Sequence, residues 1–189
     1  PSNTSVLYAW GSNPNERALN IHLPWSDNNV YYDCGFSSGG FDRINKVATA
    51  PQQGGQWNHW AFTKNASTGW MKIYLNGVLW FVGNGKPKTI SIMNMILGKD
   101  ASLQNNYKGS VNGLTVWNKE LAVADIQTFM NKPVETSHPF YANLLAQYIM
   151  NEGAGSTIEN KKNSVNSNGT NMFWVYDRGN KLNRMFTES

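Results

Sequence analysis

An aromatic-rich stretch from Trp57 to Gly77 constrains the fold more than any other part of this sequence. It holds two runs of apolar and aromatic residues with a polar loop between them, and it ends in Asn76-Gly77. Asn-Gly is the dipeptide that best favours a tight type I′ turn between antiparallel strands. The stretch therefore predicts a long β-hairpin, with a further strand after Gly77.

The alternation of side chains assigns a face to each residue beside this turn. One set is predicted to face the core and consists of Met71, Ile73, Leu75, Val78, Trp80 and Val82. The opposite set consists of Trp70, Lys72, Tyr74, Leu79 and Phe81. The strand before the polar loop has two alternatives. A plain five-residue loop over residues 65–69 turns Trp60 and Phe62 away from the core, whereas a bulge in that loop turns them inward.

Short strands separated by turn residues recur along the rest of the chain. Between Arg17 and Leu23, Leu19 and Ile21 fall on one side and His22 on the other, which is the pattern of a strand with one buried face. Further strands are predicted over residues 5–10, 30–34, 43–48, 90–97, 108–118, 144–150 and 173–176. Residues 121–130 instead follow helical spacing and predict one short helix that Pro133 closes. Such close strands favour an antiparallel sandwich or barrel.

Composition narrows the class of protein. Only 15% of the residues are charged, and the net charge of +4 comes from scattered Lys and Arg without a basic stripe, which argues against nucleic-acid binding. No apolar run approaches the roughly 20 residues that cross a bilayer, so membrane insertion is not expected. The single cysteine, Cys34, is predicted to be a small buried apolar residue. Since the chain begins at Pro1 instead of Met, we expect it to be a piece of a longer one.

Three segments, in order, resemble landmarks of a laminin G-like domain. Trp57-Asn-His-Trp-Ala-Phe-Thr is similar to the family's Trp-x-His-Val-Ala-Val strand, and Ile73-Tyr-Leu-Asn-Gly to its Leu-Tyr-Val-Asp-Gly turn. Gly109-Ser-Val-Asn-Gly-Leu-Thr-Val-Trp-Asn-Lys-Glu-Leu is similar to its closing strand and short helix. The family belongs to the concanavalin A-like lectin and pentraxin group. The resemblance implies an all-β fold, an antiparallel two-sheet jelly-roll sandwich with one short helix near the C-terminal end of the main domain.

The resemblance also suggests a division of the chain. Residues 1–136 are predicted to form the main domain, although the family's opening strands should precede Ser5 and are either missing or replaced by the tail. Residues 137–189 are predicted to be a linker and the start of a second, similar β unit, or strands that complete the first. The segment 144–155 resembles the beginning of another such domain.

An enzyme active site is not predicted. Glycoside hydrolases that share the fold use paired carboxylates, one as acid and one as nucleophile or base. The Glu residues here are dispersed, and His22, His59 and His138 lie far apart with no nucleophile signature near them. One fold hosts both enzymes and binding proteins. Whether the chain is an enzyme is therefore judged from these residues and not from the fold.

Carbohydrate recognition needs flat rings that stack on sugars and polar groups that bind hydroxyls. Trp25 is the best ring, because its turn, Pro-Trp-Ser-Asp-Asn, has little core to fill; Trp60 and Trp80 are expected to pack in the core. The predicted carbohydrate-binding residues are Trp25, Asp27, Asn28, Trp70, Lys72 and Tyr107, with Asn105 as a further polar neighbour.

Calcium is the one cofactor that the resemblance suggests for consideration. Many relatives bind calcium at the sandwich rim, but Asn76 and Asn112 stand where relatives often carry acidic residues. Calcium sites need several oxygen ligands, with carboxylates that supply the affinity. The weak candidate ligands are Asp27, Asp33, Asp42 and Asp100, which form no spaced motif.

The sequence therefore predicts a non-catalytic carbohydrate-binding or adhesion module of a secreted or cell-surface multidomain protein. Its expected partners are a carbohydrate or cell-surface glycan and other domains or subunits of a larger surface assembly. Two alternatives remain. One is a structural or protein-interaction spacer without a sugar site, and the other is an accessory domain of a secreted hydrolase.

Overall fold

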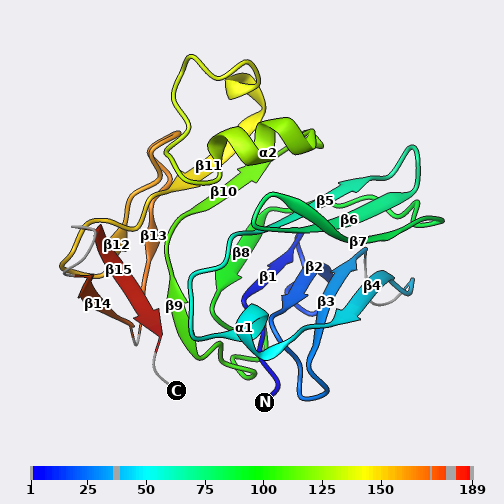
Figure 1. Cartoon of the computed structure of the whole chain (residues 1–189), viewed down its shortest axis with the longest axis horizontal. Coiled ribbons are helices and arrows are strands. Elements are labelled where there is room, and N and C mark those ends of the chain that lie inside the picture. The colour runs from blue at the N-terminus through cyan, green and yellow to red at the C-terminus, as the bar shows by residue number, and fades with distance from the viewer. Residues whose placement is uncertain (1, 36–38, 171, 178–181, 188–189) are drawn as a thin grey trace. The chain divides into compact units, whose positions relative to one another are not determined.

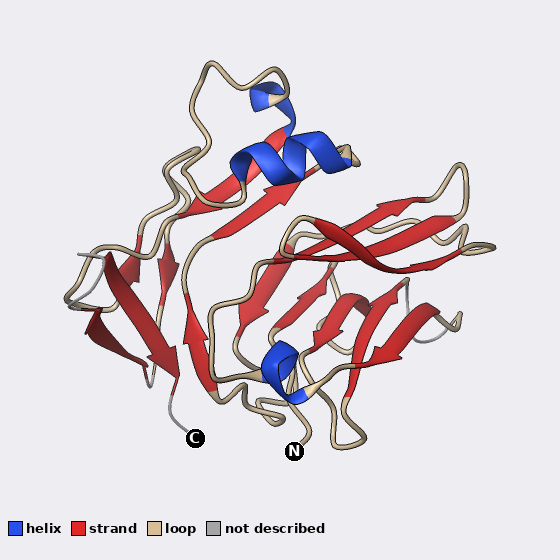
Figure 2. Cartoon of the chain, viewed as in Figure 1, coloured by secondary structure: helices blue, strands red, loops and turns tan. Residues whose placement is uncertain are grey.

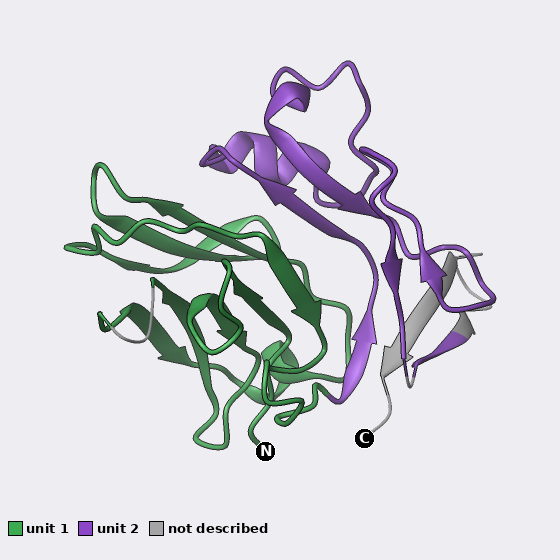
Figure 3. Cartoon of the chain, turned by 180° about the vertical axis from the view of Figure 1, so that it is seen from behind, with its two compact units in different colours: residues 1–107 green, residues 108–189 purple. Residues whose placement is uncertain are grey.

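The computed structural model describes residues 2–35, 39–170, 172–177 and 182–187. Contacts divide the chain into two compact units, unit 1 (residues 1–107) and unit 2 (residues 108–189), which are described separately (Figure 3). Strands dominate both units and helices are short (Figure 2). The predicted all-β, antiparallel class is confirmed. No helix among the described residues is long and apolar enough to cross a membrane.

Unit 1 contains a five-stranded antiparallel sheet with the strand order β4-β3-β2-β1-β8 (Figure 1). Its strands are β1 (Leu7–Trp10), β2 (Arg17–His22), β3 (Asn29–Cys34), β4 (Asp42–Val47) and β8 (Asn94–Leu97). The strand predicted over residues 90–97 is therefore shorter than expected. A short helix, α1 (Ala50–Gln53), follows β4 and was not predicted. It begins after Thr49, which caps it, and has Pro51 in its first turn, where proline is tolerated.

A second, three-stranded sheet of unit 1 contains the predicted hairpin. Its strands are β5 (Trp60–Asn65), β6 (Trp70–Leu75) and β7 (Val78–Gly83). Asn76 and Gly77 have φ angles of 50° and 76°, as a type I′ turn requires. The predicted turn is confirmed.

The core of unit 1 lies between these two sheets. Ile21, Val30 and Tyr32 of the larger sheet form one buried cluster with Met71 and Ile73 of the smaller one. The Tyr32 ring meets Phe62 across the sheets, with ring centroids 5.3 Å apart. Cys34 is fully buried in this cluster, as predicted, and burial raises the pKa of its thiol to about 12.

The pairing of β5 with β6 decides between the two alternatives for Trp60. Asn65 pairs with Trp70, so the connecting loop has an even number of residues, and Trp60 stands opposite Leu75 and Phe62 opposite Ile73. Directly opposite residues share a face. Trp60 and Phe62 therefore face the core, and the alternative that turned them inward is correct.

A bulge in β7 corrects the predicted faces on the other side of the turn. The register shifts at Trp80, so that Phe81 and not Trp80 pairs with Ile73. Phe81 packs against the core, whereas Val78 and Val82 are 64% and 39% exposed. The core position predicted for Val82 and the outward position predicted for Phe81 are wrong, because strict alternation does not allow for a bulge. Val78 precedes the bulge and pairs with Leu75, but it is exposed beside the turn, so its predicted core position is wrong as well. Trp80 still packs against the core, as expected.

Asn76 also fastens the hairpin to the segment that precedes β5. Its side-chain Oδ1 accepts the His59 N–H at 2.8 Å, and its Nδ2 donates to Asn58 Oδ1 at 3.1 Å. We expect Asn76→Ala to lower the free energy of unfolding by about 2 kcal/mol, because it loses these bonds and strains a residue with positive φ. Asn76→Gly, which tolerates the positive φ, should lose about 1 kcal/mol. Urea denaturation measures both, and equal losses would refute a contribution from the backbone angle.

Unit 2 contains small antiparallel sheets and one α-helix among its described residues. Its elements are β9 (Gly109–Val111), β10 (Leu114–Trp117), α2 (Val123–Phe129), the 3₁₀ helix η1 (Tyr141–Asn143), β11 (Leu144–Tyr148), β12 (Thr157–Ile158), β13 (Ser167–Asn168), β14 (Met172–Asp177) and β15 (Leu182–Thr187). Strands β10 and β11 pair, as do β12 and β13, and β15 lies between β14 and β9. The predicted short helix is confirmed as α2. The strand predicted over residues 108–118 is divided in two at Gly113, whose φ is 82°.

The pairing of β10 with β11 bears on the predicted boundary between the main domain and residues 137–189. Leu114 stands opposite Tyr148 and Val116 opposite Ala146, so these strands join residues from both sides of the boundary predicted at 136/137. The boundary between the two compact units instead falls between residues 107 and 108 of the sequence. The division of the chain into domains remains a prediction.

Candidate functional site

A cavity of about 300 Å³ lies on the face of the five-stranded sheet that is turned away from the core. This volume is at the lower end of the range for small-molecule sites. The lining consists of Arg17, Asn20, His22, Trp25, Tyr31, Arg43, Asp100 and Asn105, all in unit 1.

A row of polar residues crosses the sheet beneath the cavity. Asn20 of β2 stands opposite Asp33 of β3, and Asp33 stands opposite Arg43 of β4. Since opposite residues share a face, the three strands present one continuous polar surface. Asn20 and Asp33 are buried, and Asn20 Oδ1 accepts the Ser5 hydroxyl at 2.7 Å, which leaves its Nδ2 group as the end that can donate to a ligand.

A second bulge brings Arg17 to this surface. The register passes from Leu19 opposite Ala9 to Arg17 opposite Trp10 and skips Ala18. Strict alternation would have placed Arg17 on the core face with Leu19, but the extra residue turns it to the face of Asn20. The sequence prediction missed Arg17, and no periodicity in the sequence signals this bulge.

Asp33 is the centre of an ion cluster beneath the cavity. Its carboxylate is fully buried and accepts Arg43 Nε at 2.6 Å and Arg43 Nη2 at 2.7 Å, while Arg17 Nη1 lies 3.2 Å away. Arg17 lies over the Phe41 ring, 3.8 Å from its centroid. Burial lowers the pKa of Arg17, Asp33 opposes this shift, and the charge of Arg43 adds to it. Both arginines stay charged at neutral pH.

His22 and Trp25 form a wall of the cavity. His22 Nδ1 lies 2.9 Å from the Thr4 carbonyl oxygen, which can only accept, so Nδ1 carries the proton. Burial lowers the pKa of His22 despite this bond, so the ring is neutral at pH 7 and its Nε2 is an acceptor. The Trp25 ring meets His22 edge to face, with centroids 4.4 Å apart. As predicted, His22 lies on the face away from the core.

Asp27 positions the hydroxyl of Tyr31 at the same wall. Tyr31 donates to Asp27 Oδ2 at 2.6 Å, and the Asn29 N–H donates to Oδ1 at 3.0 Å. These two bonds lower the pKa of Asp27, with the bond from Tyr31 making the larger contribution. Asp27 is therefore ionised. Its side chain is exposed, and it contributes to the cavity by orienting the Tyr31 hydroxyl.

A tight loop of residues 98–106 supplies Asp100 and Asn105. Asp100 Oδ1 accepts Ser102 Oγ at 2.6 Å and the Gln104 N–H at 3.1 Å, and its Oδ2 accepts Asn105 Nδ2 at 2.5 Å. The Ser5 N–H donates to the Asn105 carbonyl at 2.7 Å and ties the loop to the sheet. The two side chains are thus held in place before any ligand arrives.

The predicted carbohydrate-binding residues fall in different places. Trp25 lines the cavity and Asp27 adjoins it. Asn28 has a φ of 65° in the same turn, and its Oδ1 accepts Gln53 Nε2. Trp70 and Lys72 lie on β6 of the other sheet, and Tyr107 packs against the core. Their role in binding remains a prediction.

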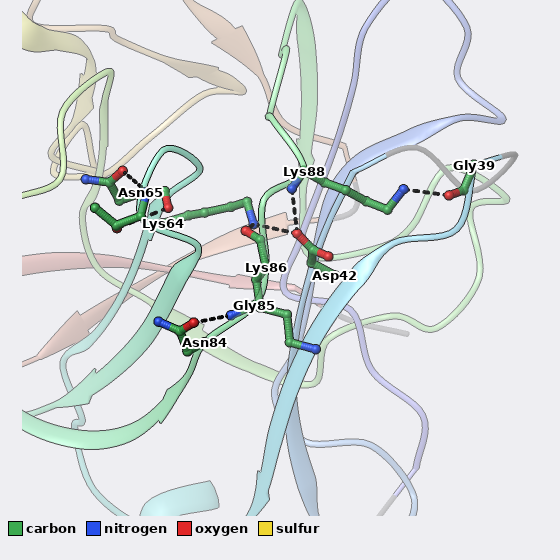
Figure 4. Close-up of polar contacts among 9 residues, drawn as sticks. Gly39, Asp42, Lys64, Asn65, Asn84, Gly85, Lys86 and Lys88 are labelled. Atoms are coloured by element: carbon green, nitrogen blue, oxygen red, sulfur yellow. Dashed lines mark hydrogen bonds and ion pairs between the residues drawn. The ribbon is translucent and has the colours of Figure 1, made fainter.

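The four candidate calcium ligands are not brought together. Asp33 is held by two arginines, and Asp42 Oδ2 accepts Lys64 Nζ at 2.9 Å and the Lys88 N–H at 2.8 Å (Figure 4). Burial alone would raise the pKa of Asp42, but these two bonds outweigh it and the net shift is downward. Among the described residues, no group of three or more His, Cys, Asp or Glu side chains could hold a metal ion. Calcium binding stays a prediction to which this geometry lends no support.

A family model and one solved structure agree with the architecture. A family model described as the concanavalin A-like lectin/glucanases superfamily matches residues 1–127. A candidate carbohydrate-binding protein from Bacteroides ovatus has a similar structure, with a TM-score of 0.65 and 16% identity over 89% of this chain and 47% of that one. This chain thus spans less than half of that protein. An S-layer domain-containing protein from Clostridium thermocellum (residues 221–444) aligns over 68% of this chain and 63% of that one, with a TM-score of 0.30 and 14% identity. No curated protein sequence matches the chain.

Proposed function

Since the chain belongs to the concanavalin A-like lectin/glucanases superfamily, we propose that unit 1 is a non-catalytic carbohydrate-binding module and that the cavity over β2, β3 and β4 is its site. The observation that carries the proposal is the combination, in one cavity, of the Trp25 ring with polar groups that are already held in place. We propose further that the module belongs to a secreted or cell-surface multidomain protein and serves adhesion or glycan capture there.

The lining offers what a sugar needs. The ring of Trp25 can cover the apolar face of a sugar, since its position against His22 limits its movement. Hydroxyl groups of a sugar both donate and accept, and the cavity has donors at Arg43 and Asn20 Nδ2 and an acceptor at His22 Nε2. Because these groups are tied to the sheet by other bonds, binding costs little side-chain entropy.

The lining favours binding over catalysis. Glycoside hydrolysis needs two carboxyl groups about 5–10 Å apart, on either side of the scissile bond. Among the described residues of the lining, Asp100 is the one acid, and its oxygens accept three hydrogen bonds within its own loop. A spacer domain without a sugar site, or an accessory domain of a secreted hydrolase, is the alternative role.

Two tryptophan variants test the placement of the site. We expect Trp25→Ala to weaken glycan binding about tenfold or more, because the stacking surface is lost. Trp70→Ala is the matched control, since Trp70 is 40% exposed but lies on β6 and outside the lining. A glycan array identifies bound sugars, and isothermal titration calorimetry then measures the dissociation constant of each variant.

The outcome separates the alternatives. Loss of binding in Trp70→Ala alone would place the binding site at β6, beside the neighbouring Lys72. Unchanged binding in both variants would refute both placements. Wild-type protein that binds no glycan at all would favour the spacer role.

A further inference from the structure

The ion cluster beneath the cavity carries more positive than negative charge. Asp33 supplies one buried carboxylate, whereas Arg17 and Arg43 supply two guanidinium groups, so one positive charge is left over. Asp27 also acts on Arg43, but its carboxylate lies at the exposed surface, where water and salt screen it. Asp100 brings a further carboxylate to the lining, but it belongs to the loop after β8, where its oxygens accept three hydrogen bonds. The surplus positive charge is therefore local to the arginine end of the cavity.

The two arginines still have donors to offer. Arg43 uses two of its five N–H groups on Asp33, its side chain is 38% exposed, and it lines the cavity. Arg17 Nε is buried and has no hydrogen-bond partner among the described residues. The cluster thus has more donors than its single carboxylate can satisfy, and an added anionic acceptor would complete it.

The cavity is also polar from one end to the other. Arg43 belongs to β4 at one edge of the sheet, whereas Asp100 and Asn105 follow β8 at the opposite edge. A ligand that crosses the strands would meet a cationic end and an end formed by the Asp100 carboxylate and the Asn105 amide. Such a site orients a molecule that carries an acid group at one end and hydroxyl groups at the other.

We propose that the cavity selects sugars that carry one negative charge, either a uronate carboxylate or a sulfate ester, and that Arg43 and Arg17 bind the acid group. The inference rests on the proposed function of unit 1 and specifies its ligand class. Guanidinium groups bind carboxylates and sulfates through parallel charge-assisted hydrogen bonds, which are about twice as strong as neutral ones. Trp25 then covers the sugar ring, and the hydroxyl groups point toward Asp100 and Asn105.

Matched glycans test this selectivity on the full chain. The array carries uronate oligosaccharides beside their methyl esters, and sulfated oligosaccharides beside their desulfated forms. We expect the charged member of at least one type of pair to bind about tenfold or more tightly than its neutral counterpart, and binding to weaken as NaCl is raised. The type of pair that shows the preference identifies the acid group.

Variants of Arg43 connect the preference to the cavity. Arg43→Gln removes the surplus charge but leaves Asp33 paired with Arg17, so the preference for the charged glycan should disappear. Arg43→Lys keeps the charge without the planar fork and should retain part of the preference. Lys119→Gln, which removes the same charge in unit 2, should have no effect, and thermal unfolding verifies that each variant is folded.

Each result has one meaning. Equal binding of the charged and neutral members, with loss in Trp25→Ala, would overturn the charge selectivity and leave the proposed function intact. A preference that survives Arg43→Gln would overturn the role of Arg43. Absence of binding to every glycan would overturn both proposals.

Discussion

Replacing Asp33 with asparagine is expected to lower the free energy of unfolding by about 3 kcal/mol. Asparagine has nearly the same shape, but it removes the buried carboxylate that neutralises Arg17 and Arg43. Two guanidinium groups would then face each other without a counter-ion. Breaking a buried pair costs about 3–5 kcal/mol, and we take the lower end because the Arg43 side chain is 38% exposed.

Urea denaturation of the full chain measures this loss. Asp27→Asn is the matched control, because it removes a carboxylate that is exposed and accepts hydrogen bonds from the Tyr31 hydroxyl and the Asn29 N–H. We expect a much smaller loss in that variant. If both variants unfold at the same urea concentration, the charge cluster does not stabilise the sheet.

Truncating Ile73 to alanine is expected to cost about 3–4 kcal/mol of unfolding free energy. Ile73 is fully buried on β6, the central strand of its sheet, and stands opposite both Phe62 and Phe81. The substitution removes buried methyl groups and leaves a cavity that close neighbours on both sides cannot readily fill.

Leu79→Ala is the control for this prediction. Leu79 lies on the adjacent strand β7 and is 48% exposed, so its truncation leaves no enclosed cavity. The loss of unfolding free energy in Leu79→Ala should stay below about 1 kcal/mol. A loss in Ile73→Ala no larger than that of Leu79→Ala would show that the two sheets do not pack tightly around β6. Glycan binding should change little in either variant that remains folded, because neither residue lines the cavity.

Much of the fold could be predicted because its signals are local. Asn76-Gly77 takes two positive φ angles that few other dipeptides adopt easily, so the hairpin turn is already encoded in two residues. The helix α2 follows from helical spacing and from Pro133, which cannot continue it. The alternation of Leu19 and Ile21 with Asn20 and His22 likewise indicates which face of β2 is buried.

The candidate site was predicted less well, although one signal for it was present. Tyr31 and Asp33 alternate with buried Val30 and Tyr32 in the same way that Asn20 and His22 alternate with their neighbours. Two polar outward faces on consecutive strands indicate a polar surface. The order in which the strands pair is needed before Arg43 can be placed on that surface, and the order depends on contacts between distant parts of the chain.

The sequence by itself determined the all-β class, the family, the hairpin turn and the position of Trp25 in a turn with little core to fill, because each depends on neighbouring residues or on a short motif. Only the tertiary structure decided the register. One extra residue at Ala18 turned Arg17 toward Asn20, and one at Trp80 turned Phe81 into the core. A bulge forms where it improves packing across the whole sheet, so its position is not written in the alternation of any single strand.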